Sequence, residues 1–287
     1  MLTTAAHAQT QGDDDWDYST DPSRRLTMAS ASFDSGTAVA VRCTDGALDV
    51  LVTGLPPAAG MTRTLLVGRV GEAQERESWT VGSSATVAFS QVPARFARAL
   101  RGGGRLEVVA QDETGQPDRR LVYDLPTEWA NIDRTLQACD RPLQDERDAL
   151  GGWVIPASAT NVWSTPPRPQ YSKQALDAGV ARGFAVLSCV VRPRGVVRDC
   201  RVESESPTGY RLGRSAVTAV HNARLNYDRA DPEAGAGSTF VMRFDFWIDD
   251  RLMGGDQASR LDRNYDGTAR NPGNDDNENP PLPNRPR

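Results

Sequence analysis

The stretch PQYSKQALDAGVARG, residues 169–183, decides the fold of the second half of this chain together with the runs that follow it. Ser172 stands where an N-cap is expected, a small apolar face follows it, and Gly179 stands just after the last helical position, where glycine is favoured. These features predict a short helix. The next apolar runs, Phe184–Val191 and Val196–Glu203, are separated by a tight turn that contains glycine, which predicts a β-hairpin.

A second helix and a last strand complete this pattern. Residues 214–224 place their apolar side chains on one side of a helix. From Phe240 to Ile248 apolar residues then alternate with others, which predicts a strand with one fully apolar face. We therefore expect a small α+β domain at residues 153–250.

These elements, in this order, resemble the C-terminal domain of the TonB energy-transducer family. The family's proline-x-tyrosine-proline and A-x-x-x-G-x-x-G motifs are matched by residues 169–183, except that Ser172 replaces the second proline. Its strand–turn–strand motif is matched in the hairpin with Gly195 in place, and its serine-serine-proline element by Ser204–Pro207. Residues 223–231 fit the family pattern only loosely. The resemblance covers residues from about 151 to 250 and implies a three-stranded antiparallel sheet packed on two helices.

The resemblance also implies a function. In the TonB family this sheet receives an extended segment of an outer-membrane receptor, the TonB box, as an added strand. It implies a non-enzymatic protein of the Gram-negative periplasm that takes part in energy-dependent transport across the outer membrane. Arg243, Asp245 and Trp247 would face away from the helices, or alternatively only finish a solvated sheet face. The implied docking edge consists of Thr239, Val241, Arg243, Asp245 and Trp247.

One departure from the family supports a different function. Force transmission requires an inner-membrane helix and a long proline-rich spacer, and the sequence shows neither. The alternative is a soluble periplasmic binding or envelope adaptor protein that reuses the TonB-like fold without energy transduction. The partner in both cases is a protein, and a homodimer is compatible with the sequence.

The first half of the chain is expected to be a β-rich domain with two helices over residues 26–140. The helices are expected at Pro93–Leu100 and Pro126–Cys139. This region resembles small exported β-sandwich domains of the invasion-associated locus B type, although any disulfide-stapled β-sandwich would share its features. The expected strands are Val39–Cys43, Leu48–Thr53, Leu65–Val70, Thr86–Phe89, Leu106–Ala110 and Leu121–Tyr123.

The cysteines indicate export. There are four, none in a CxxC spacing, and only two histidines, so metal clusters and Ser-His or Cys-His catalytic pairs are nearly excluded. A Cys43–Cys139 bridge would clamp the last helix onto the sheet. In the resembled hairpin, Cys189 and Cys200 hold core-facing positions on facing strands, which implies a second bridge, with free buried thiols as the alternative. Disulfides are typical of oxidising compartments such as the periplasm.

Composition limits the kinds of partner and site that are expected. The net charge of −5 comes from interspersed signs, so neither nucleic acid nor an anionic membrane is an expected partner. We expect no catalytic residue, metal or cofactor, because no paired carboxylates or phosphate-binding glycine loop stand out. The remaining segments are interpreted as a signal-peptide remnant (1–10), a flexible leader (11–25), a linker (141–152) and a disordered tail (251–287).

Overall fold

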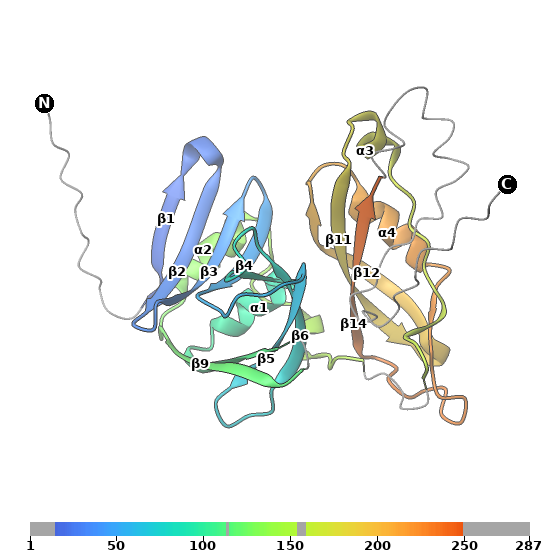
Figure 1. The fold of residues 1–287 in the computed structure, drawn as a ribbon, viewed down its shortest axis with the longest axis horizontal. Coiled ribbons are helices and arrows are strands. Elements are labelled where there is room, and N and C mark those ends of the chain that lie inside the picture. The colour runs from blue at the N-terminus through green and yellow to red at the C-terminus, as the bar shows by residue number, and fades with distance from the viewer. Residues whose placement is uncertain (1–14, 113–114, 154–158, 249–287) are drawn as a thin grey trace, which may run out of the picture. The chain divides into compact units, whose positions relative to one another are not determined.

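The computed structural model of this chain describes residues 15–112, 115–153 and 159–248. The chain folds into two compact units that are divided between Gln144 and Asp145 (Figure 1). The division lies inside the segment expected to be a linker. The expected signal-peptide remnant and disordered tail lie outside the described residues.

The expected fold class, α+β with a three-stranded second domain, is wrong. The structure is mostly β, with 44% of it in strands and 18% in helices. Over the residues that it describes, it contains two antiparallel sheets, one of nine strands and one of five. The sequence pattern missed strands that are short, such as Arg224–Leu225, and strands whose side chains are mostly small or polar, such as Leu26–Phe33.

The N-terminal unit is built on the nine-stranded sheet, with strand order β1-β2-β3-β4-β7-β6-β5-β8-β9. Two helices accompany it, α1 (Pro93–Leu100) and α2 (Ala130–Ala138). The helix α1 has the bounds expected from the sequence. The strands are β1 (Asp17–Asp21), β2 (Leu26–Phe33), β3 (Thr37–Thr44), β4 (Ala47–Thr53), β5 (Thr62–Arg69), β6 (Glu75–Val81), β7 (Ala88–Ser90), β8 (Gly104–Gln111) and β9 (Pro117–Leu125).

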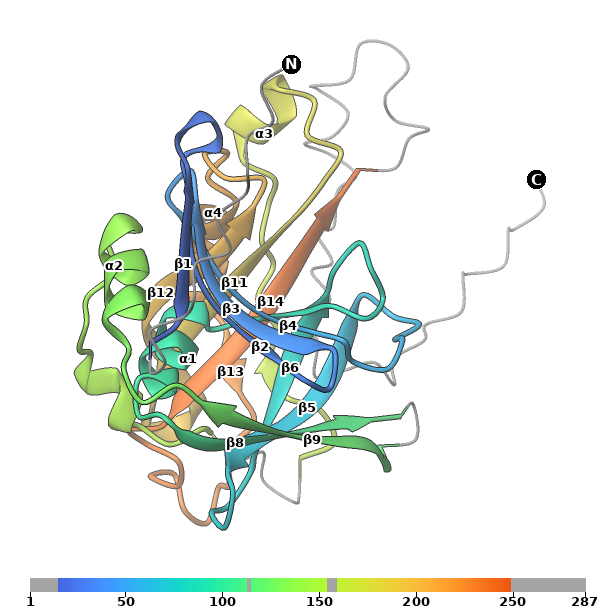
Figure 2. The same cartoon turned by 90° about the vertical axis from the view of Figure 1, so that its left-hand side faces the viewer.

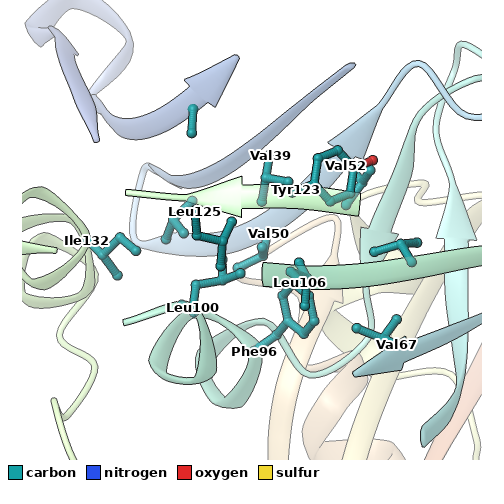
Figure 3. Packing of buried hydrophobic residues seen from close by; sticks show 14 of the residues in the cluster. Val39, Val50, Val52, Val67, Phe96, Leu100, Leu106, Tyr123, Leu125 and Ile132 are labelled. Atoms are coloured by element: carbon teal, nitrogen blue, oxygen red, sulfur yellow. The ribbon is translucent and has the colours of Figure 1, made fainter. Parts of the chain in front are cut away.

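The core of this unit forms because the sheet folds over on itself. In Figure 2 the strands β8 and β9 cross the direction of β2 and β3. The rings of Phe33 in β2 and Tyr123 in β9 lie 4.7 Å apart, so the two halves of the sheet meet across the core. Figure 3 shows Val39 and Tyr123, from the two halves, in one cluster with Phe96 of α1.

Part of the expected leader is ordered, so the expectation of a flexible segment at 11–25 is wrong for the residues described. Asp17–Asp21 forms β1, which pairs antiparallel with β2. Trp16 is buried, and the side-chain amide of Asn131 in α2 donates a hydrogen bond to its carbonyl oxygen at 2.8 Å. Burial of this indole fixes a segment whose composition is otherwise polar.

The C-terminal unit is built on the five-stranded sheet, with strand order β10-β13-β12-β11-β14. Its helices are α3 (Lys173–Asp177) and α4 (Leu212–Val220). The Ser172 hydroxyl accepts a hydrogen bond from the Ala175 N–H at 3.0 Å, as expected for an N-cap. The strands are β10 (Trp163–Thr165), β11 (Arg182–Arg192), β12 (Val196–Ser206), β13 (Arg224–Leu225) and β14 (Thr239–Trp247).

The two added strands, β10 and β13, turn the expected three-stranded sheet into five. The strand β13 lies beside the β11–β12 turn, where Gly195 has a φ of +66°. A Cβ atom at Gly195 would collide with the carbonyl oxygen of Leu225. Glycine is therefore required at this position both for the turn conformation and for the approach of β13.

Candidate functional site

The strand β14 forms one edge of the C-terminal sheet (Figure 1). It pairs antiparallel with β11 over nine residues, from Val190 opposite Thr239 to Arg182 opposite Trp247. The opposite edge strand, β10, has three residues and an irregular register. A long, regular edge is the kind that accepts an additional strand, so β14 is the better candidate.

The hydrogen bonds at the ends of β14 establish which backbone groups point outward. The Ile248 N–H donates to the Ala181 carbonyl at 3.0 Å, and the Val191 N–H donates to the Ser238 carbonyl at 2.8 Å. Even-numbered residues of this strand therefore direct their backbone groups toward β11, and by alternation the odd-numbered ones direct theirs outward. The outward residues are Thr239, Val241, Arg243, Asp245 and Trp247, which are the residues that the sequence analysis named.

The first outward position is already occupied by the chain itself. The Thr239 N–H donates to the Gly151 carbonyl at 2.8 Å, and the Trp153 N–H donates to the Thr239 carbonyl at 2.7 Å. Gly152 forms a parallel β-bridge with Thr239. The indole of Trp153 packs edge to face on the Phe240 ring, with 5.5 Å between the ring centroids. We call Gly151–Trp153 the strap. It falls in the expected linker, and its glycines gave no signal of pairing.

The two faces of β14 differ in chemistry. Met242, Phe244 and Phe246 belong to the hydrophobic core, together with Leu212 and Ala216 of α4. Because side chains alternate along a strand, the odd-numbered residues lie on the opposite face. By this alternation, Arg243, Asp245 and Trp247 lie on the face of β14 opposite the core that contains α4.

The alternative interpretation, a solvated sheet face, is wrong for Arg243. Its side chain is buried, with 4% of the residue exposed. The guanidinium group lies 3.9 Å from the centroid of the Phe184 ring, and its Nε donates to Asp245 Oδ1 at 2.8 Å. Trp247, by contrast, is 37% exposed. The edge thus presents a fixed ion pair followed by an accessible indole.

A second polar group lies on this face, and sequence reasoning missed it. Arg147, in the short 3-10 helix Glu146–Ala149, donates to the carbonyl and the hydroxyl oxygen of Ser188 at 3.1 and 3.2 Å. The Ser188 hydroxyl in turn donates to Glu203. Burial lowers the pKa of Arg147 from its usual value. These contacts anchor the chain just before the strap to β11 and β12.

Both disulfides join the cysteines expected from the sequence. Cys43 is bonded to Cys139, and Cys189 in β11 to Cys200 in β12. All four cysteines are therefore oxidised. Two disulfides are typical of a protein that folds in an oxidising compartment, as an exported protein does.

Two further observations concern metal sites and membrane-spanning helices. Over residues 15–112, 115–153 and 159–248, no group of three or more His, Cys, Asp or Glu side chains is placed to hold a metal ion. Within the same ranges, no helix has the length and apolar character needed to cross a membrane.

Neither the protein-family models nor the curated proteins with which the sequence was compared match it. A function can therefore be argued only from the motif residues and from the geometry of the β14 edge.

Proposed function

We propose that this chain is a TonB-like protein of the periplasm that binds an extended segment of a partner protein by strand addition to β14. The partner would be an outer-membrane receptor, and the binding would serve energy-dependent transport across the outer membrane. The chain would act by binding rather than by catalysis.

The observation that carries this proposal is the outward direction of alternate backbone groups along Val241–Trp247. Beyond the strap, no strand among the described residues pairs with this side of β14. An added strand would gain main-chain hydrogen bonds there, while the Arg243–Asp245 pair and Trp247 would select its side chains.

Photocrosslinking in cells tests this proposal. A photoreactive amino acid at Trp247 is expected to capture an outer-membrane receptor, because this position is accessible and lies on the edge. Val122 is a matched control, since it is equally exposed, at 37%, and lies in the edge strand β9 of the other unit. Equal capture from both positions, or no outer-membrane protein from Trp247, would contradict the proposal.

A substitution that removes one outward donor provides an independent test. Val241→Pro deletes an N–H that points away from β11 and leaves the pairing with β11 intact. We expect capture from Trp247 to fall while the thermal unfolding temperature changes little. Undiminished capture would show that the partner does not bind as an added strand.

The adaptor function is a second candidate, and one observation favours it. The residues before the C-terminal unit form a nine-stranded sheet with its own core rather than a spacer. An adaptor would bind its partner whether or not the inner membrane is energised. Crosslinking from Trp247 that is unchanged after a protonophore dissipates the proton gradient would favour the adaptor, and a gradient-dependent crosslink would favour the transducer.

A further inference from the structure

The N-terminal unit contains a hollow of about 490 Å³ that the proposed function does not use. It lies where three segments meet: the connection between β1 and β2, the turn between β3 and β4, and the end of α2 (Figure 1). Small-molecule sites in proteins have volumes of about 300–1,000 Å³. The hollow is therefore large enough to hold a small ligand.

Two turns form the mouth of the hollow. Asp45 and Gly46 both have a positive φ, of +52° and +78°, as in the type I′ turn that an Asp-Gly pair favours between two strands. This turn directs the Asp45 N–H to the Arg25 carbonyl oxygen, to which it donates at 3.1 Å. The side chains of the same two residues form an ion pair. A cation and an anion thus lie in direct contact at the mouth.

Arg25 holds a backbone conformation that arginine rarely adopts. Its φ is +49°, in the left-handed region that favours glycine. The ion pair offsets little of this strain, because 74% of the Arg25 side chain and 53% of the Asp45 side chain are exposed. Strained residues are concentrated at functional sites. The guanidinium group of Arg25 is therefore a candidate contact for a ligand.

The floor of the hollow combines an apolar surface with one polar group. Thr27 and Cys43 are cross-strand neighbours, so their side chains lie on the same face of the sheet. Cys43 is bonded to Cys139, and Pro22 and Ala138 add further apolar lining. The Thr27 hydroxyl oxygen is buried and has no hydrogen-bond partner among the described residues. A ligand would supply that partner once the side chain rotates toward the hollow.

These groups define the charge and shape of the ligand. One cation and one anion give the mouth no net charge, so a dianion such as phosphate does not match it. Because Arg25 and Asp45 are in contact, a ligand that meets both must carry its own charges close together. An α-amino acid does so, since its carboxylate and its ammonium group are attached to one carbon atom. The carboxylate would pair with Arg25 and the ammonium group with Asp45.

Two energetic terms favour such a ligand. The exposed ion pair at the mouth contributes little to stability, so its two side chains can turn toward the ligand at little cost. An apolar side chain on the ligand would leave water and pack against Pro22, Ala138 and the disulfide. The volume of the hollow leaves room for a large side chain of this kind.

We propose that this hollow binds a free α-amino acid with a large apolar side chain. The site goes beyond the proposed function, because it lies in the N-terminal unit and requires neither β14 nor a second protein. The chain would then carry a small-molecule site in addition to its strand-binding edge.

Titration of the purified full chain with L-phenylalanine tests the proposal by NMR. The amide resonances of Thr27 and Asp45 should shift and saturate, whereas those of the C-terminal unit should not move. N-acetyl-L-phenylalanine lacks the ammonium group and L-phenylalaninamide lacks the carboxylate, so each should bind at least about tenfold more weakly. Shifts that do not saturate, or an analogue that binds as tightly as the amino acid, would overturn the inference.

Substitutions at the mouth separate binding from stability. Arg25→Gly removes the guanidinium group and places glycine at a positive φ, so binding should weaken at least about tenfold while the thermal unfolding temperature changes little. Asp45→Asn removes the other charge and keeps a residue that tolerates the left-handed conformation, so it should weaken binding similarly. Arg24→Gln is the matched control, because Arg24 pairs with Asp21 and is not part of the lining.

The opposite pattern would show that Arg25 is only structural: a lower unfolding temperature with unchanged binding in Arg25→Gly. Unchanged binding in Asp45→Asn, or an equal loss in Arg24→Gln, would also overturn the inference. None of these measurements involves β14 or an outer-membrane protein. Their failure would leave receptor docking untouched, and failure of receptor docking would leave this site untouched.

Discussion

The two units of this chain use their disulfides differently. Cys43–Cys139 joins residues 96 positions apart and connects β3 to the end of α2, whereas Cys189–Cys200 joins residues 11 positions apart on neighbouring strands. The first constrains the unfolded chain over most of a unit, and the second only locally. The N-terminal unit thus has a long-range covalent link, whereas the link in the C-terminal unit joins two strands that already pair along their length.

The largest expected effect is loss of the long-range disulfide. Replacement of Cys43 and Cys139 by alanine should lower the free energy of unfolding of the N-terminal unit by about 4.7 kcal/mol. The reason is that a disulfide closing the longer loop removes more conformational entropy from the unfolded chain. Replacement of Cys189 and Cys200 should cost the C-terminal unit about 2.8 kcal/mol. Urea titrations followed by NMR would report on each unit separately. A reversed order would show that the comparison based on loop length is wrong.

The next effect concerns the turn that receives β13. Gly195→Ala should destabilise the C-terminal unit by about 3 kcal/mol, since the new methyl group meets the Leu225 carbonyl and φ is positive. Gly46 of the N-terminal unit also has a positive φ, but open space surrounds it. Gly46→Ala should therefore cost only about 1 kcal/mol. Equal losses in thermal denaturation would mean that packing against β13 contributes little.

The third effect is a pH dependence confined to the N-terminal unit. Burial raises the pKa of Glu77 from 4.5 to about 7, and the Trp79 indole donates a hydrogen bond to its carboxyl group at 2.9 Å. Because the folded pKa lies above the unfolded one, the stabilisation is complete below about pH 4.5 and is lost as the pH rises through about 7. The expected loss is about 2 kcal/mol, as the carboxyl group keeps some contact with water.

Glu77→Gln should abolish this dependence, because the amide oxygen can still accept the indole proton and does not titrate. The Trp79 indole N–H resonance, followed by NMR between pH 4 and 8, measures the titration directly. A resonance that does not shift in the unmodified chain would contradict the buried carboxyl group as its cause.

The smallest effect involves no change in stability. The outward amides of Val241, Asp245 and Trp247 should exchange with solvent at least about tenfold faster than the inward amides of Phe240 and Met242. Hydrogen exchange in the dilute chain measures this alternation. Uniform protection along β14 would mean that the edge is covered.

Much of the fold was predictable where side chains repeat with a clear period. The helix α1 starts at a proline and ends before a run of glycines, and its bounds were predicted from those signals. The strand β6, with sequence ERESWTV, has one fully buried residue, Trp79, so no alternation marks it. The strand β13 has two residues, which is too short for any period. These omissions are why the predicted fold class was wrong.

The outward residues of β14 were predictable because its apolar face alternates cleanly. The contacts around these residues were not predictable from the sequence. Gly151 and Gly152 of the strap have no side chains to indicate pairing, and Arg147 lies in a charged stretch typical of a linker. Both depend on contacts between residues far apart in the sequence, which local patterns do not contain.

The strap gives the C-terminal unit a mechanical property. Tension applied to the chain before Asp145 would reach the sheet through three successive attachments: Asp145 to Arg201, Arg147 to Ser188, and Gly151 and Trp153 to Thr239. Since the strap runs parallel to β14, a pull along the strand would load its hydrogen bonds together in shear rather than unzip them one at a time. The strand proposed to hold a partner would then receive the load directly.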